Sequence, residues 1–320
     1  MRVLGHMAYP STTQQNLPVS DAPAQAQSMG GPGAAVGDRL AARRPRPSFW
    51  CRFSRHRAAV LGAAILLALI ALAALAPLIA PYPWAEQSIA NRWQGPSSAH
   101  LFGTDELGRD VLSRILYGGR FSLSIGFGAV LLSFTVGVLI GTISGFYRRL
   151  DPLIMRVVDV MLAFPSILLA LAIVAALGPG FLNTVIVIGV TEIPGFIRLT
   201  RSSVLSIRER EYVVAARALG ARDWRIMLHH ILPSLVSPIV VFASLRIAAA
   251  LLTGATLSFL GLGVPPPAPE WGAMISTARN SLRVGAHTFF IPTLVLFVAV
   301  IAASFLGDGL RDTLDPQIRD

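Results

Sequence analysis

The sequence predicts an all-α fold, a polytopic membrane helix bundle with six transmembrane helices. Of the 320 residues, 53% are hydrophobic and only 14% are charged, and the mean hydropathy is +0.62. Long uncharged runs recur along the chain, and a helix of roughly 20 such residues crosses the hydrocarbon core of a bilayer. The arginines gather beside these runs, as they do in membrane proteins with a fixed orientation.

The first part of the chain has a different composition from the rest. Residues 1–50 are rich in Pro, Ala, Gly, Gln and Ser and show no helical or strand periodicity. A segment of this kind cannot bury enough apolar surface to offset the entropy of ordering it. We expect a disordered cytoplasmic tail there, then the first transmembrane helix and the start of an external loop over 51–100. Residues 101–320 then form a core with five further transmembrane helices.

The first two spans are uncharged runs. Residues 58–80 form the first, with 23 residues, and residues 121–147 form the second, with 27. The second run carries Gly137, Gly141 and Gly145 at intervals of four, which lines one helix face with bare backbone. Such a face lets a neighbouring helix approach closely.

Three further spans follow from the same criterion. Residues 160–178 form the third span, which Pro165 is expected to bend, because proline removes a helical hydrogen bond. Residues 233–263 form the fifth, with Arg246 inside it, and residues 286–306 form the sixth.

The fourth span, residues 181–200, is the weakest by hydropathy, because it contains Glu192, Pro194 and Arg198. The distribution of arginines decides in its favour. With six spans, 20 arginines fall on the side of both termini and six on the other side, whereas five spans divide them evenly. The positive-inside rule therefore predicts six helices with both termini in the cytoplasm.

Between the first two spans, residues 103–120 have the pattern of an amphipathic helix. Thr104 is placed to cap it, and Leu107, Val111 and Ile115 recur on one face. We expect this helix to lie on the external membrane surface.

The loop between the fourth and fifth spans contains two further helix signals. Ser206 and Glu209 form a capping box, which predicts a helix that ends at a left-handed turn on Gly220. Asp223 is placed to cap a second short helix with one apolar and one basic face. Two short helices hinged at a glycine would form a protrusion that another protein can grip. From these residues alone, a docking site and an ordinary basic loop both remain open.

The composition excludes several classes of function. All 27 basic residues are arginine, so the chain cannot contain the lysine-bearing phosphate loop of P-loop ATPases. Its single cysteine, Cys51, excludes an intrachain disulfide and a cysteine-based metal site. The six histidines show no metal-ligand spacing, and no catalytic constellation is evident. We therefore expect no catalytic residue, no metal and no bound cofactor on this chain, and no nucleic-acid partner.

Glu192 is the one carboxylate near the middle of a predicted span. An ionisable group there is costly and marks a functional site by default. One hypothesis places Glu192 on a substrate path, where it attracts a cationic group of the solute. The alternatives are an ion pair with Arg246 or Arg198, or accommodation beside the kink at Pro194. An ion-coupled secondary transporter would also use such a carboxylate.

Residues 211–233, EYVVAARALGARDWRIMLHHILP, resemble the cytoplasmic coupling motif of permease subunits in binding-protein-dependent ABC importers. That motif reads EAA, three residues, G, nine residues, I, one residue, LP. Val214 stands where the motif has its glutamate and His230 where it has isoleucine. The positions that match in spacing are Ala215, Ala216, Gly220, Leu232 and Pro233.

Three further segments are similar to the dipeptide, oligopeptide and nickel branch of that family: residues 102–126, 257–275 and 306–316. The similarity runs from about residue 58 to the C-terminus. It implies a type I ABC importer permease-like fold in a bacterial inner membrane, with residues 101–320 as permease core and coupling helices near 206–231. The resemblance further implies half of a translocation channel for di- and oligopeptides, driven by ATP. The alternatives are the same architecture importing nickel or another small solute or, less in keeping with the motifs, an ion-coupled secondary transporter.

The resemblance also implies a set of partners. These are a second homologous permease subunit, two ATPase subunits, an extracytoplasmic solute-binding protein and the lipid bilayer. ATP and Mg²⁺ would be bound by the ATPase subunits, so this chain would not itself be an enzyme. Carried over to this sequence, the ATPase-coupling contacts are Ala215, Ala216, Leu219, Gly220, Ala221 and Arg222.

Overall fold

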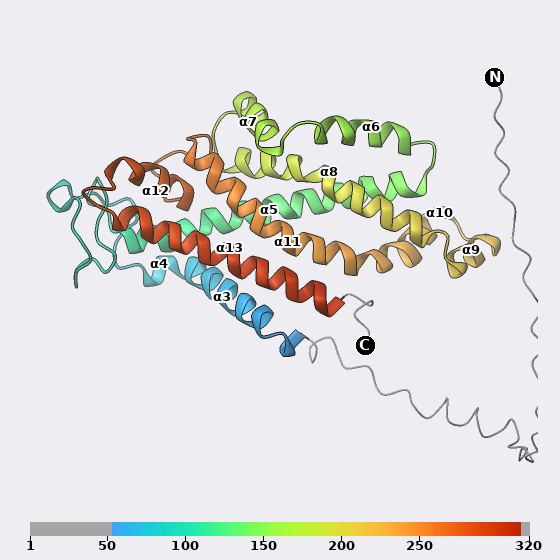
Figure 1. The fold of residues 1–320 in the computed structure, drawn as a ribbon, viewed down its shortest axis with the longest axis horizontal. Helices are drawn as coiled ribbons and strands as arrows, with labels where there is room; N and C mark the ends of the chain where they lie inside the picture. The colour runs from blue at the N-terminus through green and yellow to red at the C-terminus, as the bar shows by residue number, and fades with distance from the viewer. Residues whose placement is uncertain (1–52, 315–320) are drawn as a thin grey trace, which may run out of the picture. The chain divides into compact units, whose positions relative to one another are not determined.

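The computed structural model describes residues 53–314, so the tail predicted over 1–50 lies outside the described residues. Within 53–314 the chain consists of helices joined by turns, without a β-strand, and strand-like pairing there is limited to one bridge between Thr104 and Asp110. Figure 1 shows the long helices packed side by side. The predicted all-α class is confirmed.

The first span consists of two helices, α3 (Arg57–Ala74) and α4 (Ala76–Ile79), which together match the predicted range. They are separated at Leu75, because Pro77 in the first turn of α4 has no N–H to continue the hydrogen bonds of α3. The short 3-10 turn η1 (Ile89–Asn91) follows.

The centre of the bundle is the pair α5 (Val111–Phe146) and α8 (Phe181–Ile207), which pack along much of their length. The three glycines of α5 lie against α8. A Cβ atom added to Gly141 would stand 2.7 Å from Cβ of Thr200, and one added to Gly145 would stand 2.7 Å from Cβ of Val204. The predicted close approach of another helix to α5 is confirmed. That helix is α8, the predicted fourth span, which hydropathy supported least.

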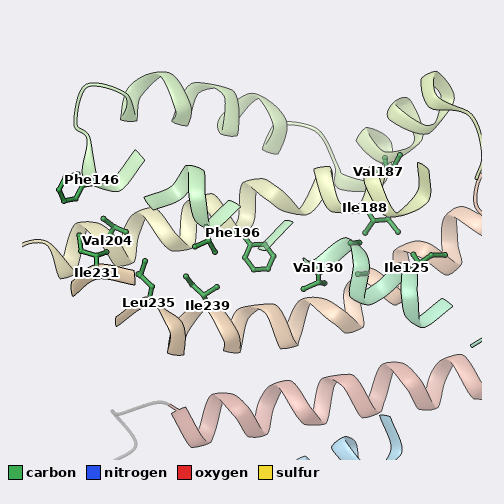
Figure 2. Close-up of a cluster of buried hydrophobic side chains, with 14 of the residues drawn as sticks. Ile125, Val130, Phe146, Val187, Ile188, Phe196, Val204, Ile231, Leu235 and Ile239 are labelled. Atoms are coloured by element: carbon green, nitrogen blue, oxygen red, sulfur yellow. The ribbon is translucent and has the colours of Figure 1, made fainter. Parts of the chain in front are cut away.

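Buried side chains from α5, α8 and α11 (Leu232–Phe259) form the largest apolar cluster (Figure 2). Phe196 is fully buried and meets Phe134 and Phe242 edge to face, at ring-centroid distances of 6.2 and 4.9 Å. Leu235 and Ile239 of α11 join the same cluster. The fourth span is therefore a core helix of the bundle in spite of its polar residues.

The remaining helices cover this core. Helix α13 (His287–Leu314) packs against both α11 and α3. Helix α12 (Trp271–Ala278), followed by η3 (Arg279–Ser281), lies at one end of the bundle (Figure 1). Trp271 is buried there, and its Nε1 donates a hydrogen bond of 3.0 Å to the carbonyl of Ile115. The predicted fifth and sixth spans are thus α11 and α13, and α13 continues beyond the predicted end.

The predicted surface helix over 103–120 is wrong. Gly103 and Gly108 have positive φ angles of 73° and 71°, and these break any helix through 103–110. Helix α5 begins at Val111 instead, where Asp110 caps it by accepting a 2.8 Å hydrogen bond from the N–H of Ser113. From there α5 continues without interruption into the second span, and Ile115 is buried in the bundle.

The predicted third span is bent more strongly than expected. It consists of α6 (Asp151–Leu162) and α7 (Ser166–Leu177), which are related by 93° across a break that contains Pro165. Each has 12 residues, which at 1.5 Å per residue gives about 18 Å, too short to cross a bilayer alone. The described residues contain five helices that could cross a membrane, or six when this bent pair counts as one span.

Candidate functional site

The predicted docking protrusion lies between α8 and α11. It consists of α9 (Glu211–Ala218), a turn at Gly220, and α10 (Asp223–Ile226). Figure 1 shows α9 and α10 at the end of the bundle that is remote from α12. We refer to residues 208–226 as the docking segment.

The predicted capping box at Ser206 is wrong. Helix α8 runs through Ser206 to Ile207, and the next helix begins at Glu211 after Arg210, whose backbone is extended. The end of α8 is held by Val204 and Ile207, which are 0% and 5% exposed. Buried apolar contacts therefore extend α8 past the residues that resemble a helix start.

The left-handed turn at Gly220 is confirmed, with a φ of +79°. The N–H of Gly220 donates to the carbonyl of Arg217 at 3.0 Å, and the N–H of Ala221 donates to the carbonyl of Ala216 at 3.1 Å. This is the Schellman arrangement that ends helices at a glycine. An added Cβ atom at Gly220 would have no neighbour within 4 Å, so the glycine is required by backbone conformation and not by crowding within the chain.

The predicted second short helix starts at the expected place but is not separate. Arg222, and not Asp223, occupies its N-cap position. Helix α10 continues through the π-helical stretch η2 (Met227–Ile231) into α11, so Asp223–Phe259 form one helix of 37 residues. The docking segment is therefore continuous with the fifth span.

The residues of the docking segment fall into two groups, those buried against the bundle and those exposed at its surface. Val213 and Ile226 are 0% exposed and hold the segment to the bundle. Leu219, at the tip, is 88% exposed, and Tyr212, Val214 and Trp224 of the same segment are also exposed. The six predicted contact residues are all accessible: Ala215, Leu219, Gly220 and Arg222 are exposed, and Ala216 and Ala221 are partly exposed.

A polar cluster ties the docking segment to the neighbouring helices. Asp151, in the first turn of α6, accepts hydrogen bonds from Nη2 of Arg201 at 2.6 Å and from Oγ of Ser144 at 2.7 Å. Arg208 donates to the carbonyl of Gly145 at 2.9 Å. Apart from Gly145, sequence reasoning did not single out these residues, because their partners lie on helices distant in sequence. We refer to Ser144, Gly145, Asp151, Arg201 and Arg208 as the polar clamp.

Glu192 has a defined partner inside the bundle. Its Oε2 lies 3.3 Å from Nη1 of Arg246, and the two side chains are 13% and 37% exposed. Arg198 pairs instead with Asp159 at 2.9 Å, and that pair is largely exposed. Of the two partners considered from the sequence, Arg246 is the one that Glu192 contacts.

A cleft of about 940 Å³ lies between α8, α11 and the end of α13, close to the docking segment. The part farther from the docking segment is apolar and includes Leu199, Phe242 and Leu245. Hydroxyl and guanidinium groups line the part near the docking segment, and no carboxylate belongs to its wall. The polar residues of the cleft are Ser202, Ser203, Ser206, Arg210, Ser234, Ser237 and Arg311.

Two family models match the chain. Residues 134–320 match the model described as binding-protein-dependent transport system inner membrane component, and residues 47–96 match the N-terminal TM domain of oligopeptide transport permease C. The first of these covers the docking segment, Glu192 and Arg246. The second covers the first span.

Similar proteins cover most of this chain. A glutathione transport system permease protein of Pectobacterium atrosepticum is 46% identical over 279 residues, which are 87% of this chain and 93% of the relative. A dipeptide transport system permease protein of Alkalihalophilus pseudofirmus is 44% identical over 283 residues, which are 88% of this chain and 93% of the relative.

A solved structure has a similar fold. A chain of the MetNI methionine ABC transporter in an inward-facing conformation aligns with a TM-score of 0.53 and 18% identity, over 62% of this chain and 96% of that one. The fold, the two family models and the relatives agree with one another. The chain therefore belongs to the binding-protein-dependent transport system inner membrane component family, as a multi-pass permease of the dipeptide and oligopeptide branch of ABC importers.

Proposed function

We propose that this chain forms one half of the translocation channel of an ATP-driven importer of di- and oligopeptides. The relatives named for dipeptide and glutathione transport support the solute class. The observation that carries the coupling role is the docking segment, which is anchored by two fully buried residues and presents an almost fully exposed leucine. An exposed apolar side chain on a rigid, capped protrusion is suited to a protein partner.

The partners are a second homologous permease, two ATPase subunits and an extracytoplasmic solute-binding protein. ATP and Mg²⁺ are bound by the ATPase subunits, because this chain has no lysine and hence no P-loop. The docking segment faces the cytoplasm, as do both termini, and the arginine distribution supports this orientation. The contact set on the ATPase is Ala215, Ala216, Leu219, Gly220, Ala221 and Arg222.

Coupling follows from the connections of the docking segment. When the ATPase subunits close on ATP, they displace the segment. The continuous helix from α10 to α11 carries the movement into the fifth span, and the polar clamp carries it into α5 and α6. Rigid helices transmit displacement because their hydrogen bonds are internal.

Glu192 lies on the substrate path in this proposal. It belongs to α8, and Arg246 belongs to α11, so the pair joins the two spans that flank the docking segment. Movement of the docking segment is thus transmitted to the two helices that carry these charges.

The proposal is tested by a matched pair of glycine substitutions. Gly220 and Gly261 both have positive φ angles, +79° and +82°, and an added Cβ atom at either has no neighbour within 4 Å. The backbone strain of replacing them is therefore similar, but Gly261 lies beyond the end of α11, away from the docking segment. We expect Gly220→Arg to lose ATPase copurification and ATP-dependent uptake, and Gly261→Arg to retain both.

Two results would overturn the proposal. One is peptide uptake by Gly220→Arg at the rate of the unsubstituted chain. The other is uptake that continues when the ATPase subunits carry inactivating substitutions, which would indicate an ion-coupled secondary transporter.

A further inference from the structure

The face of α8 that lines the cleft continues to Glu192. Leu199, Ser202 and Ser206 of α8 belong to the wall of the cleft. Residues three and four apart lie on one helix face, and Glu192 falls on the same face two turns before Leu199. The carboxylate therefore lies on the helix face that forms one wall, about two turns beyond the last residue of that wall.

The ion pair between Glu192 and Arg246 lies next to the cleft, beyond the residues that line its apolar end. Phe242 belongs to the wall, and the guanidinium carbon of Arg246 lies 4.7 Å from the centroid of its ring. A Cβ atom added to Gly195 would stand 3.5 Å from Nη2 of Arg246 and 3.3 Å from the ring of Phe242. The small residue lets the guanidinium and the ring lie close to α8. Through Phe242, the apolar end of the cleft is thus in contact with a charged pair.

The outer part of the cleft has a different charge. Arg210 and Arg311 belong to its wall, together with five serines, and neither arginine has a carboxylate partner within the described residues 53–314. Hydroxyl and guanidinium groups both donate hydrogen bonds to anions. A solute that leaves Arg246 with its carboxylate toward the docking segment would meet further donors for the same group.

An ion pair inside a bundle is costly to separate, because each charge then lacks a partner in a poorly hydrated place. A passing solute can avoid this cost only if it supplies both missing partners. An ammonium group can replace Arg246 beside Glu192, and a carboxylate can replace Glu192 beside Arg246. A bare metal cation or a neutral solute supplies at most one of the two.

We propose that the Glu192–Arg246 ion pair closes the path and opens by exchanging partners with a dipolar solute. The solute carries a free ammonium group that pairs with Glu192 and a free carboxylate that pairs with Arg246. This inference rests on the proposed function and narrows its solute class to zwitterions with separated charges, such as peptides with both termini free. The two residues select the solute at the gate, in addition to any selection by a binding protein.

The test compares the ratio of uptake of two solutes between each variant and the unsubstituted importer, so that selection by the binding protein cancels. The complete importer, with its ATPase subunits and binding protein, is reconstituted in vesicles, and uptake of a free dipeptide is measured against its N-acetylated and C-amidated forms. In Glu192→Gln the ammonium loses its partner. We expect the ratio of free to N-acetylated uptake to fall by about tenfold, the factor for one lost charge-assisted contact. In Arg246→Gln we expect the same fall for the ratio of free to C-amidated uptake.

A matched control and a charge exchange complete the design. Arg198→Gln removes a pair on the same helix, with Asp159, in which both side chains are more than half exposed and which does not belong to the cleft. It should leave both ratios unchanged. The double variant Glu192→Arg with Arg246→Glu restores an ion pair and should keep ATP-dependent uptake, whereas each charge-reversed single variant should lose it.

The outcomes separate the two proposals. ATP-dependent uptake with ratios that are equal in all variants overturns the partner exchange and leaves the importer function intact. An equal fall of both ratios in each single variant also overturns it, because the loss is then not specific to one end of the solute. Absence of ATP-dependent uptake by the unsubstituted importer overturns the proposed function itself. Stimulated ATP hydrolysis by each variant shows that the assembly is intact when uptake is lost.

Discussion

Gly141 of α5 lies so close to Thr200 of α8 that an added Cβ atom would stand 2.7 Å from Cβ of Thr200 and 2.8 Å from the carbonyl oxygen of Ile197. The neighbouring contacts of Gly137 with Phe196 and of Gly145 with Val204 repeat this relationship one turn before and after. The spacing of four in α5 thus matches the spacing of four in α8. The two helices that form the core of the bundle can approach this closely because the three glycines have no side chains.

Replacing Gly141 by Val therefore forces α5 and α8 apart. Overpacking of this kind costs about 1–3 kcal/mol of unfolding free energy. We expect a lower thermal midpoint for the purified permease in detergent. Leu139→Val is the control, because Leu139 is on the same helix and 59% exposed, and it should leave the midpoint nearly unchanged. Equal midpoints for the two variants would contradict the close packing.

The polar clamp should contribute more to stability than the exposed ion pair beside it. The side chains of Asp151 and Arg201 are 20% and 27% exposed, whereas those of Asp159 and Arg198 are 63% and 56% exposed. Double-mutant cycles with alanine measure each coupling energy separately. We expect about 1 kcal/mol for Asp151–Arg201 and near zero for Asp159–Arg198, since solvent screens exposed pairs. A larger value for the exposed pair would show that the clamp is not a structural connection.

Glu270 is 1% exposed and caps α12. One carboxylate oxygen accepts from Oγ of Ser122 at 2.9 Å, and the other accepts from the N–H of Ala273 at 2.8 Å. Glu270→Ala removes the cap and leaves the Ser122 hydroxyl without this partner, which should cost about 2 kcal/mol. Glu209→Ala, at an exposed glutamate, serves as the control in the same thermal unfolding measurement. Stability that is unaffected by Glu270→Ala would mean that the buried apolar residues of α12 hold it without the cap.

Leu219 is predicted to act on the ATPase and not on the fold. Its side chain is 88% exposed, so Leu219→Ala should leave the thermal midpoint unchanged. Its loss from the contact should weaken ATPase binding by about tenfold or more, as for a central interface residue. Leu78→Ala is the matched control, because Leu78 is 82% exposed in α4, outside the docking segment. Titration of the ATPase subunit onto the immobilised permease measures both affinities, and equal affinities would exclude Leu219 from the contact.

Much of the bundle could be predicted from local sequence. Hydropathy and arginine distribution located the spans, and the glycine intervals located the face of closest packing. The turn at Gly220 was predictable because glycine adopts a positive φ at little cost and commonly ends a helix in this way. These features depend only on short stretches of sequence and on the general properties of a lipid bilayer.

The helix boundaries depended on contacts that the sequence does not display. The apolar spacing of α5 extends back to Leu107, but the turns at Gly103 and Gly108 stop the helix at Val111. A local signal did exist at this boundary, namely Asp110 placed three residues before Ser113. At the start of α11, the π-helical stretch before Pro233 lets α10 continue where a break was expected.

The candidate site was also only partly predictable, because some of its features are local in sequence and others depend on distant contacts. The docking segment has a spacing motif and could be located, although its helix limits could not. The choice of Arg246 over Arg198 as partner of Glu192, and the contact between Arg208 and Gly145, depend on how distant helices pack. The cleft next to them is formed by three helices and has no signature in any one of them.

The central claim is that the tip of the docking segment contacts an ATPase subunit. A photoreactive maleimide attached to Leu219→Cys, in a Cys51→Ser background, tests this directly in the assembled importer. Irradiation should produce an adduct with the ATPase subunit whose yield changes when ATP is added, and the same probe on Leu78→Cys should produce none. An ATPase adduct from position 78 and none from position 219 would contradict the claim.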